Sequence, residues 1–278
     1  MRISHILAAL VTIPLAAAAA TTAGTWSLDS ADEPGKVQFS LQGSSDGSHF
    51  NTSSPWLLAD LRGLDWAGAA KHDVHFTIQR DAGSIDCEGF AQDQRGSGLF
   101  TFKPNPQYIA EMAKLGFSFE DKKLLSATIF DVSFDFARAM QSAAVRGLDA
   151  GKLFAFRIHG VTPEFIRDLR AAGLEAADAG KLIAFRIHGV TPEFVRDLHG
   201  AGISTTDEDK LVAFRIHGVS PEFAGEISHL GYPHAPPEQL IALRIHGVTP
   251  QYIEGLRSKG MQNLTLDQLI SLRIHGID

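Results

Sequence analysis

The chain has 278 residues, of which 44% are hydrophobic and 21% are charged, which is typical of a globular protein with one or two domains. Its formal net charge of -7 excludes a general nucleic-acid binder, because such a protein needs a basic surface to neutralise phosphates. The single cysteine, Cys87, excludes an internal disulfide, and we expect it to be a buried apolar residue in a strand.

The first twenty residues have a composition of their own. They carry Arg2 near the start, an apolar run from Ile6 to Ala20, and small residues before Thr21. This order is typical of a secretory signal peptide, and the run is shorter than the roughly 20 residues that span a membrane. We therefore expect a signal peptide at residues 1–20, cleaved after Ala20 or Ala23. The mature protein would be periplasmic or secreted, with no membrane span after cleavage.

Residues 24–103 have the pattern of β-strands. Segments 36–42 and 74–79 alternate apolar and polar residues, segments 84–92 and 99–102 follow, and turns rich in glycine and aspartate separate them. They predict a small antiparallel β domain. Segment 25–28 is a candidate edge strand, and segment 53–68 is open between a short helix and a covering loop.

Two groups in this domain are candidates for function. Trp56 and Trp66 are candidates for stacking on a sugar ring, with burial in the core as the alternative for both. His72, Asp73 and His75 are a weak candidate for a hydrolase site, because surface polarity explains such a short polar stretch equally well.

Residues 104–278 form a repeat. His159, His188, His217, His246 and His275 are each 29 residues apart, and fainter copies begin at residues 105 and 132. A fixed period of this length is typical of a solenoid, in which no unit buries its apolar face alone. The sequence thus predicts an α+β multidomain chain: a small antiparallel β domain followed by an α-solenoid of about six 29-residue helical hairpins.

Each unit is predicted to contain two helices. The first has Thr191 as N-cap, Pro192 at its first position and Glu193 near the positive end of the helix dipole. The second half of the unit, KLVAFRIH at 210–217, is either a buried strand or a helix. The acidic start at 206–209 and a capping box of Thr265 with Gln268 favour the helix.

The repeated His-Gly pair is predicted to end the second helix. The histidine ring is placed to cap a carbonyl group, and the glycine suits the left-handed residue that follows a helix. The expected structural caps are His159, Gly160, His188, Gly189, His217, Gly218, His246, Gly247, His275 and Gly276. A ligand-binding or proton-sensing role for the histidines is the alternative.

The repeat predicts neither a metal site nor a cofactor. Equivalent residues of neighbouring units lie roughly 8–10 Å apart, whereas zinc–nitrogen bonds are about 2.1 Å, so two of these histidines would not share one ion. The sequence contains no HExxH and no CxxC motif. We therefore expect no catalytic residue and no enzyme activity.

Five arginines recur inside apolar helix ends, where a charged group needs a partner. One hypothesis pairs them with Glu164, Glu193 and Glu222, each seven residues after an arginine; Gln251 takes the glutamate's place in the last full unit. The other is an exposed ladder that binds an anionic partner. The candidate binding residues are Arg157, Arg186, Arg215, Arg244 and Arg273.

The phrase RIHGVTPEF with KLIAFRIHG resembles a helical repeat of bacterial exported proteins, which is also appended to some membrane metallopeptidases of the beta-lactam sensor type. The resemblance is strong over 152–278 and weak over 104–151, and segment 76–105 resembles segments that precede such repeats. It carries over no catalytic residue, since the zinc motif of the peptidase is missing. We expect an exported, non-enzymatic interaction scaffold with a protein partner in the cell envelope. The alternative is a sensor whose β domain binds a small molecule or glycan and whose repeats relay binding to a membrane sensor or peptidase.

Overall fold

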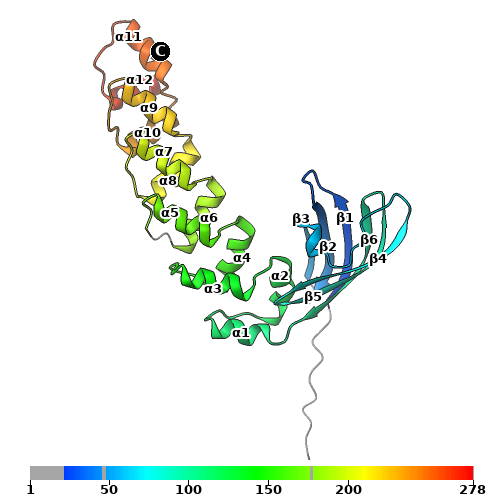
Figure 1. Cartoon of the computed structure of the whole chain (residues 1–278). Coiled ribbons are helices and arrows are strands. Elements are labelled where there is room, and N and C mark those ends of the chain that lie inside the picture. The colour runs from blue at the N-terminus through cyan, green and yellow to red at the C-terminus, as the bar shows by residue number, and fades with distance from the viewer. Residues whose placement is uncertain (1–21, 46–47, 176–177, 278) are drawn as a thin grey trace, which may run out of the picture. The chain divides into compact units, whose positions relative to one another are not determined.

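The computed structural model describes residues 22–45, 48–175 and 178–277, so the expected signal peptide lies outside the described residues. The chain divides into two compact units between Gln107 and Tyr108 (Figure 1). The first unit is a six-stranded antiparallel sheet and the second is helical, which makes the chain an α+β protein. Within the described ranges, no helix is long and apolar enough to cross a membrane.

The sheet has the order β3-β2-β1-β6-β5-β4, and every neighbouring pair is antiparallel. Its strands are β1 (Thr22–Ser30), β2 (Lys36–Ser45), β3 (Ser48–Leu57), β4 (His72–Arg80), β5 (Gly83–Gln92) and β6 (Arg95–Pro104). The edge position expected for segment 25–28 is wrong, because β1 pairs with β2 on one side and with β6 on the other. Segment 53–68 completes β3 and then forms a short 3-10 helix, η1 (Leu58–Asp60).

Alternate residues of the strands bury one face of the sheet. Phe39 on β2 and Phe76 on β4 contact each other with ring centroids 6.1 Å apart, although three strands separate β2 from β4. Trp26 on β1 packs edge-on against the same Phe76 at 5.1 Å. The sheet is therefore strongly curved, and its aromatic core lies on the concave face. Cys87 is fully buried in β5, as predicted, and burial raises the pKa of its thiol.

Twelve α-helices occupy the described part of the second unit. They are α1 (Tyr108–Lys114), α2 (Leu124–Ile129), α3 (Phe134–Ser142), α4 (Ala150–His159), α5 (Pro163–Ala171), α6 (Ala179–His188), α7 (Pro192–Gly200), α8 (Glu208–His217), α9 (Pro221–His229), α10 (Pro237–Ile245), α11 (Pro250–Ser258) and α12 (Leu266–Ile274). A 3-10 turn, η2 (Asp121–Lys123), precedes α2. The second half of each repeat is thus a helix and not a strand, as the flanking residues predicted.

The helices contact one another in two rows. One row consists of the even-numbered helices, in which neighbours contact each other in the order α4, α6, α8, α10, α12 (Figure 1). The other row consists of the odd-numbered helices, in the order α5, α7, α9, α11. Equivalent residues of successive repeats therefore recur along one row, at the spacing of packed helices. We refer to the even-numbered row as the B row and to the odd-numbered row as the A row.

The joints between helices follow from the residues at their ends. The Thr191 side chain accepts a hydrogen bond from the backbone N–H of Phe194 at the start of α7. At the end of α4, Gly160 is left-handed with φ of 69°, and the N–H of buried Val161 bonds to the carbonyl of Phe156 at 2.8 Å. Asp131 has φ of 51° at the equivalent place after α2, so the first helical repeat forms the same joint without glycine.

Candidate functional site

The repeated arginines reach backward along the chain. Nε of Arg186 donates a hydrogen bond to the carbonyl oxygen of His159, 27 residues earlier, at 3.1 Å. Its guanidinium lies over the ring of Phe165, 5.0 Å from the centroid. Arg186 thus binds the last turn of the preceding B helix and stacks on the A helix between them, which satisfies one of the carbonyls that a helix end leaves open.

The same contacts recur along the row. Nε of Arg215 donates to the carbonyl of His188 at 3.3 Å, and Nε of Arg244 donates to that of His217 at 3.4 Å. The stacking distances from guanidinium to ring are 4.9–5.0 Å for Arg157 on Phe136, Arg215 on Phe194, Arg244 on Phe223 and Arg273 on Tyr252.

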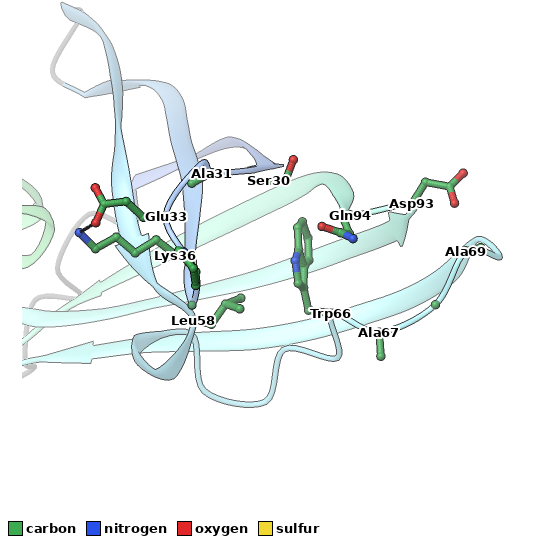
Figure 2. Close-up of a pocket in the computed structure, with 13 residues that line it drawn as sticks. Ser30, Ala31, Glu33, Lys36, Leu58, Trp66, Ala67, Ala69, Asp93 and Gln94 are labelled. Carbon is green, nitrogen blue, oxygen red and sulfur yellow. Dashed lines mark hydrogen bonds and ion pairs between the residues drawn. The ribbon is translucent and has the colours of Figure 1, made fainter.

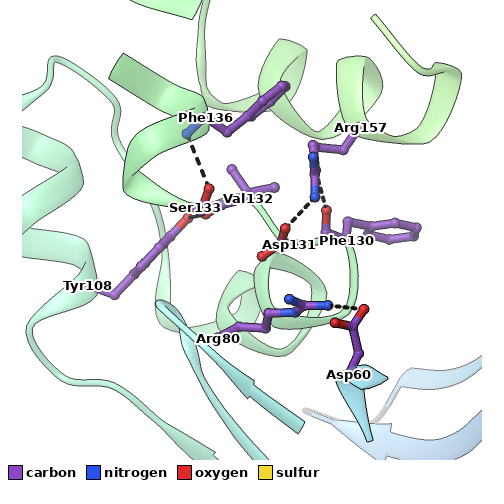
Figure 3. A network of polar contacts seen from close by, with 9 residues as sticks. All are labelled: Asp60, Arg80, Tyr108, Phe130, Asp131, Val132, Ser133, Phe136 and Arg157. Atoms are coloured by element: carbon purple, nitrogen blue, oxygen red, sulfur yellow. Dashed lines mark hydrogen bonds and ion pairs between the residues drawn. The ribbon is translucent and has the colours of Figure 1, made fainter. Parts of the chain in front are cut away.

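Arg157, at the first of these joints, has an acidic partner. It donates from Nε to the carbonyl of Phe130 at 2.9 Å and from Nη2 to the Asp131 carboxylate at 2.5 Å (Figure 3). Later units have glycine in the place of Asp131, as at Gly160. Among these joints, the carboxylate is therefore specific to the one that Arg157 forms with the helical repeat before it.

The expected pairing of arginines with glutamates is wrong. Among the described residues none of the three glutamates binds its expected arginine, and Glu193 instead pairs with Arg196 at 2.8 Å. The pKa of Glu193 is lowered by its own backbone N–H, by the Thr191 hydroxyl and by Arg196. The glutamates therefore belong to the start of the A helices and not to the arginine joints.

Three arginines remain without a carboxylate. Arg186, Arg215 and Arg244 form no ion pair with any acidic residue within the described ranges. Each keeps one face of its guanidinium on an aromatic ring and one N–H on a carbonyl, so its position is fixed while its charge is not neutralised. This arrangement suits an anionic partner.

A row of exposed isoleucines accompanies these arginines, and it was not singled out from the sequence. Each isoleucine directly follows a repeated arginine in the phrase RIH. Their exposed fractions are 53% for Ile158, 56% for Ile187, 56% for Ile216, 54% for Ile245 and 57% for Ile274. The sequence signal was the presence of a large apolar residue between two polar ones at every helix end.

The histidines are exposed at the ends of the B helices, but the predicted capping by the ring is found at only one of the five in the described part of the chain. The ring of His275 does cap a carbonyl, with Nδ1 2.7 Å from the oxygen of Ser271. For the rings of His159, His188, His217 and His246 no hydrogen bond is found in the described part of the chain, so the arginine of the next unit caps the helix end instead at the first three. Across all the residues that the structure describes, no group of three or more histidine, cysteine, aspartate or glutamate side chains is placed to hold a metal ion.

The β unit has a pocket of about 550 Å³ at one end of its sheet (Figure 2). The indole of Trp66 stands in it, half-buried, close to the side chain of Gln94 from the β5–β6 turn. Glu33 and Lys36, which form an ion pair at 2.5 Å, line its other side. An aromatic face beside amide, carboxylate and ammonium groups is an arrangement that suits a polar ring-shaped ligand.

Trp56 does not share that environment. It is 8% exposed and packs edge-on against Phe39 with centroids 5.5 Å apart. It belongs to the aromatic core, which was the alternative for this residue, and Trp66 alone of the two lines the pocket.

His72, Asp73 and His75 do not converge. They are the first residues of β4, where successive side chains point to opposite faces of the sheet, so His72 lies on the other face from Asp73 and His75. The His72 ring contacts the carbonyls of Ala70 at 3.0 Å and Asp65 at 3.2 Å, which raises its pKa. These two carbonyl contacts account for the position of the His72 ring structurally.

The candidate surfaces are therefore the arginine and isoleucine rows of the helical unit and the Trp66 pocket of the β unit. A comparison with protein-family models finds no match for this chain, and a comparison with curated proteins finds none either.

Proposed function

We propose that the protein is an exported, non-enzymatic scaffold that binds a protein partner through its repeated helices, arranged as an α-solenoid of about six 29-residue hairpins. The observation that carries this proposal is the row of isoleucines, five equivalent side chains that are each more than half exposed. A regular row of exposed large apolar side chains is typical of a binding site, since exposing them to water is unfavourable.

The repeat gives the row its regularity. Successive B helices contact each other, so the isoleucines follow one line across five helices. Long ridged surfaces of stacked repeats commonly serve as binding surfaces. The resemblance to repeats of exported bacterial proteins and the secretory pattern of residues 1–20 support a partner in the periplasm or outside the cell.

The test is affinity capture from cell-envelope extracts with a triple variant, Ile187→Ser/Ile216→Ser/Ile245→Ser. The proposal expects a protein that the wild type retains and the triple variant loses, because serine removes the apolar contact without a folding cost at exposed sites. Leu99→Ser is the control, since Leu99 is 67% exposed but lies on β6. Equal capture by wild type and triple variant would contradict the proposal.

A second candidate function is ligand binding by the β unit. It does not depend on the proposed scaffold function of the helices. The Trp66 pocket favours it, because a half-buried indole beside Gln94, with Glu33 across the pocket, offers both a stacking face and polar groups. Titration of oligosaccharides while following tryptophan fluorescence should show saturable quenching that is lost in Trp66→Ala. Quenching that persists in Trp66→Ala, or none with any sugar, would exclude the pocket as a glycan site.

A further inference from the structure

The arginines and the exposed isoleucines occupy the same ends of the B helices. Arg186 binds the carbonyl of His159, the residue that follows Ile158, and Arg186 itself precedes Ile187. The guanidinium of Arg186 therefore lies at the joint between the two helix ends that carry Ile158 and Ile187. Arg215 occupies the equivalent joint between the helix ends of Ile187 and Ile216, and Arg244 does so between those of Ile216 and Ile245. Each joint between successive B-helix ends thus carries one exposed isoleucine on either side and one arginine at the joint itself.

The cations at these joints are positioned before any partner arrives. Stacking on Phe165, Phe194 and Phe223 and the bonds from Nε fix the three guanidiniums, while no carboxylate of the described residues neutralises them. A carboxylate brought against a fixed guanidinium forms a strong, charge-assisted hydrogen bond with little further loss of side-chain freedom. The complementary surface therefore carries acidic side chains beside aliphatic ones.

The spacing favours a helix as the occupant. Packed neighbouring helices lie roughly 8–10 Å apart, which sets the distance between successive isoleucines. On an α-helix, residues seven apart face the same side and are separated by about 10.5 Å. An extended strand presents same-face residues about 6.7 Å apart, which does not match the row. A helix that crosses the B helices meets one isoleucine per seven residues.

We infer that the surface formed by Ile158, Ile187, Ile216 and Ile245 with Arg186, Arg215 and Arg244 binds an acidic amphipathic helix of a partner protein. This inference rests on the proposed function and specifies the chemistry of the partner. Aliphatic residues of that helix, seven apart, pack on the isoleucines, and aspartates or glutamates beside them pair with the arginines.

The test uses the full chain and three labelled synthetic helices of about 24 residues, or roughly 36 Å. The first carries leucine on one face and glutamate beside it, the second has lysine for glutamate, and the third has serine for leucine. Fluorescence anisotropy should show saturable binding of the first peptide, weakened by added salt. The second and third peptides should bind about tenfold more weakly or not at all.

Two sets of variants locate the binding. The affinity for the acidic peptide should fall by about tenfold or more in the triple variant Ile187→Ser/Ile216→Ser/Ile245→Ser. It should not change in Leu99→Ser. Arg215→Gln should lower the affinity for the acidic peptide and make that affinity less dependent on salt concentration. Arg196→Gln is the matched control, because Arg196 is already paired with Glu193 on the neighbouring A row. Circular dichroism of each variant confirms that the helices remain folded.

Any one of four binding results would overturn the inference, and so would the absence of binding by every peptide. Two of the four concern the peptides: the basic peptide binds as tightly as the acidic one or more tightly, or the acidic peptide still binds the triple variant. The other two concern a different occupant: the isoleucines are needed for self-association in sedimentation, or for binding to vesicles of phosphatidylcholine and phosphatidylglycerol. If no peptide binds while envelope capture still depends on the isoleucines, the inference is wrong and the proposed function stands. If that capture also fails, both are wrong.

Discussion

Gly218 combines two requirements of the repeated joint. Its φ of 72° lies in the left-handed region, and a Cβ placed on it would approach Nη2 of Arg244 to 2.9 Å. A side chain at this position therefore strains the backbone and pushes away the arginine that binds the carbonyl of His217. The glycine of RIHGV is thus needed for the next unit as well as for its own.

We predict that Gly218→Ala lowers the free energy of unfolding by about 1–2 kcal/mol, because L-residues are disfavoured in the left-handed region. The control is Gly225→Ala inside α9, where nothing lies within 4 Å of the added Cβ. That change should stabilise the protein by about 0.5–1 kcal/mol, since alanine is the better helix former. Denaturant unfolding followed by circular dichroism measures both, and a neutral Gly218→Ala would contradict the assigned role.

Arg215 is predicted to stabilise the joint without an acidic partner. Arg215→Met keeps an apolar stem against Phe194 but loses the cation–ring attraction and the bond to the carbonyl of His188. The expected loss is about 1 kcal/mol, the sum of an exposed cation–π contact and part of a hydrogen bond. Arg196→Met, which removes a surface ion pair with Glu193, should cost less than about 0.5 kcal/mol in the same unfolding experiment.

The repeat explains why the arginine partner was mispredicted. In an exact repeat every residue lies at constant spacing from every other, so a glutamate seven residues later and an aromatic residue 21 residues earlier are equally regular. The last full unit holds the distinguishing signal. Gln251 replaces the glutamate there while Tyr252 keeps the aromatic ring, and Arg273 stacks on that ring at 4.9 Å.

At the scale of single elements, the starts of the A helices couple stability to pH. The pKa values of Glu164, Glu193 and Glu222 are lowered by hydrogen bonds from their own backbone N–H groups and from the N-cap hydroxyls, the serine hydroxyl being the larger cause for Glu222. A folded-state pKa below the unfolded value stabilises the native state above the unfolded pKa, and this contribution is lost as pH falls through the folded pKa.

We therefore predict that Glu164→Gln/Glu193→Gln/Glu222→Gln is less stable than the wild type at neutral pH. The difference should diminish as pH falls below about 4.3, the usual glutamate value, and vanish once the wild-type carboxyls are protonated. Thermal unfolding between neutral pH and pH 3 measures it. Gln251 already occupies this position in α11, so the variant helices are expected to fold, and a difference independent of pH would contradict the prediction.

Helix elements were more predictable than strands because their signals are local. N-caps, proline at the first turn and glycine after the last turn each act within a few residues, and the capping box of Thr265 with Gln268 is present as expected. The position of a strand in a sheet depends on distant partners. Residues 25–28 resemble an edge strand by length, yet β1 lies between β2 and β6, and β3 continues through a proline that obscured it.

At the scale of the whole molecule, the two units have separate cores. Phe76 contacts Trp26 and Phe39 inside the sheet, whereas Phe156, Phe185 and Phe214 are buried among the helices. We predict that Phe76→Ala destabilises the β unit by about 3–5 kcal/mol through loss of packing. The unfolding transition of the helices, followed at 222 nm, should stay unchanged. Leu99→Ala, at an exposed site on β6, should shift neither transition, and a common shift of both in Phe76→Ala would show that the units unfold together.

The curvature of the sheet and the exposed rows of the helices were the least predictable features of the molecule. Contact between β2 and β4 follows from twist accumulated over several strands, which no short segment encodes. The exposure of Ile187 and its equivalents contradicts the usual pattern in which apolar residues of a helix face the core. Such an exception is visible only when the buried residues of the same helix are known.

The backward bonds from Arg186, Arg215 and Arg244 to the preceding repeat have a consequence for how such a chain can change in length. Because donor and acceptor always belong to adjacent copies, a duplicated stretch of one period brings its own donor and offers its own acceptor, and no existing joint has to be redesigned. Gene duplication within the array is therefore structurally neutral at the joints. Each added copy also adds one exposed isoleucine and one arginine to the B row, so the row can grow longer without a change in any existing contact.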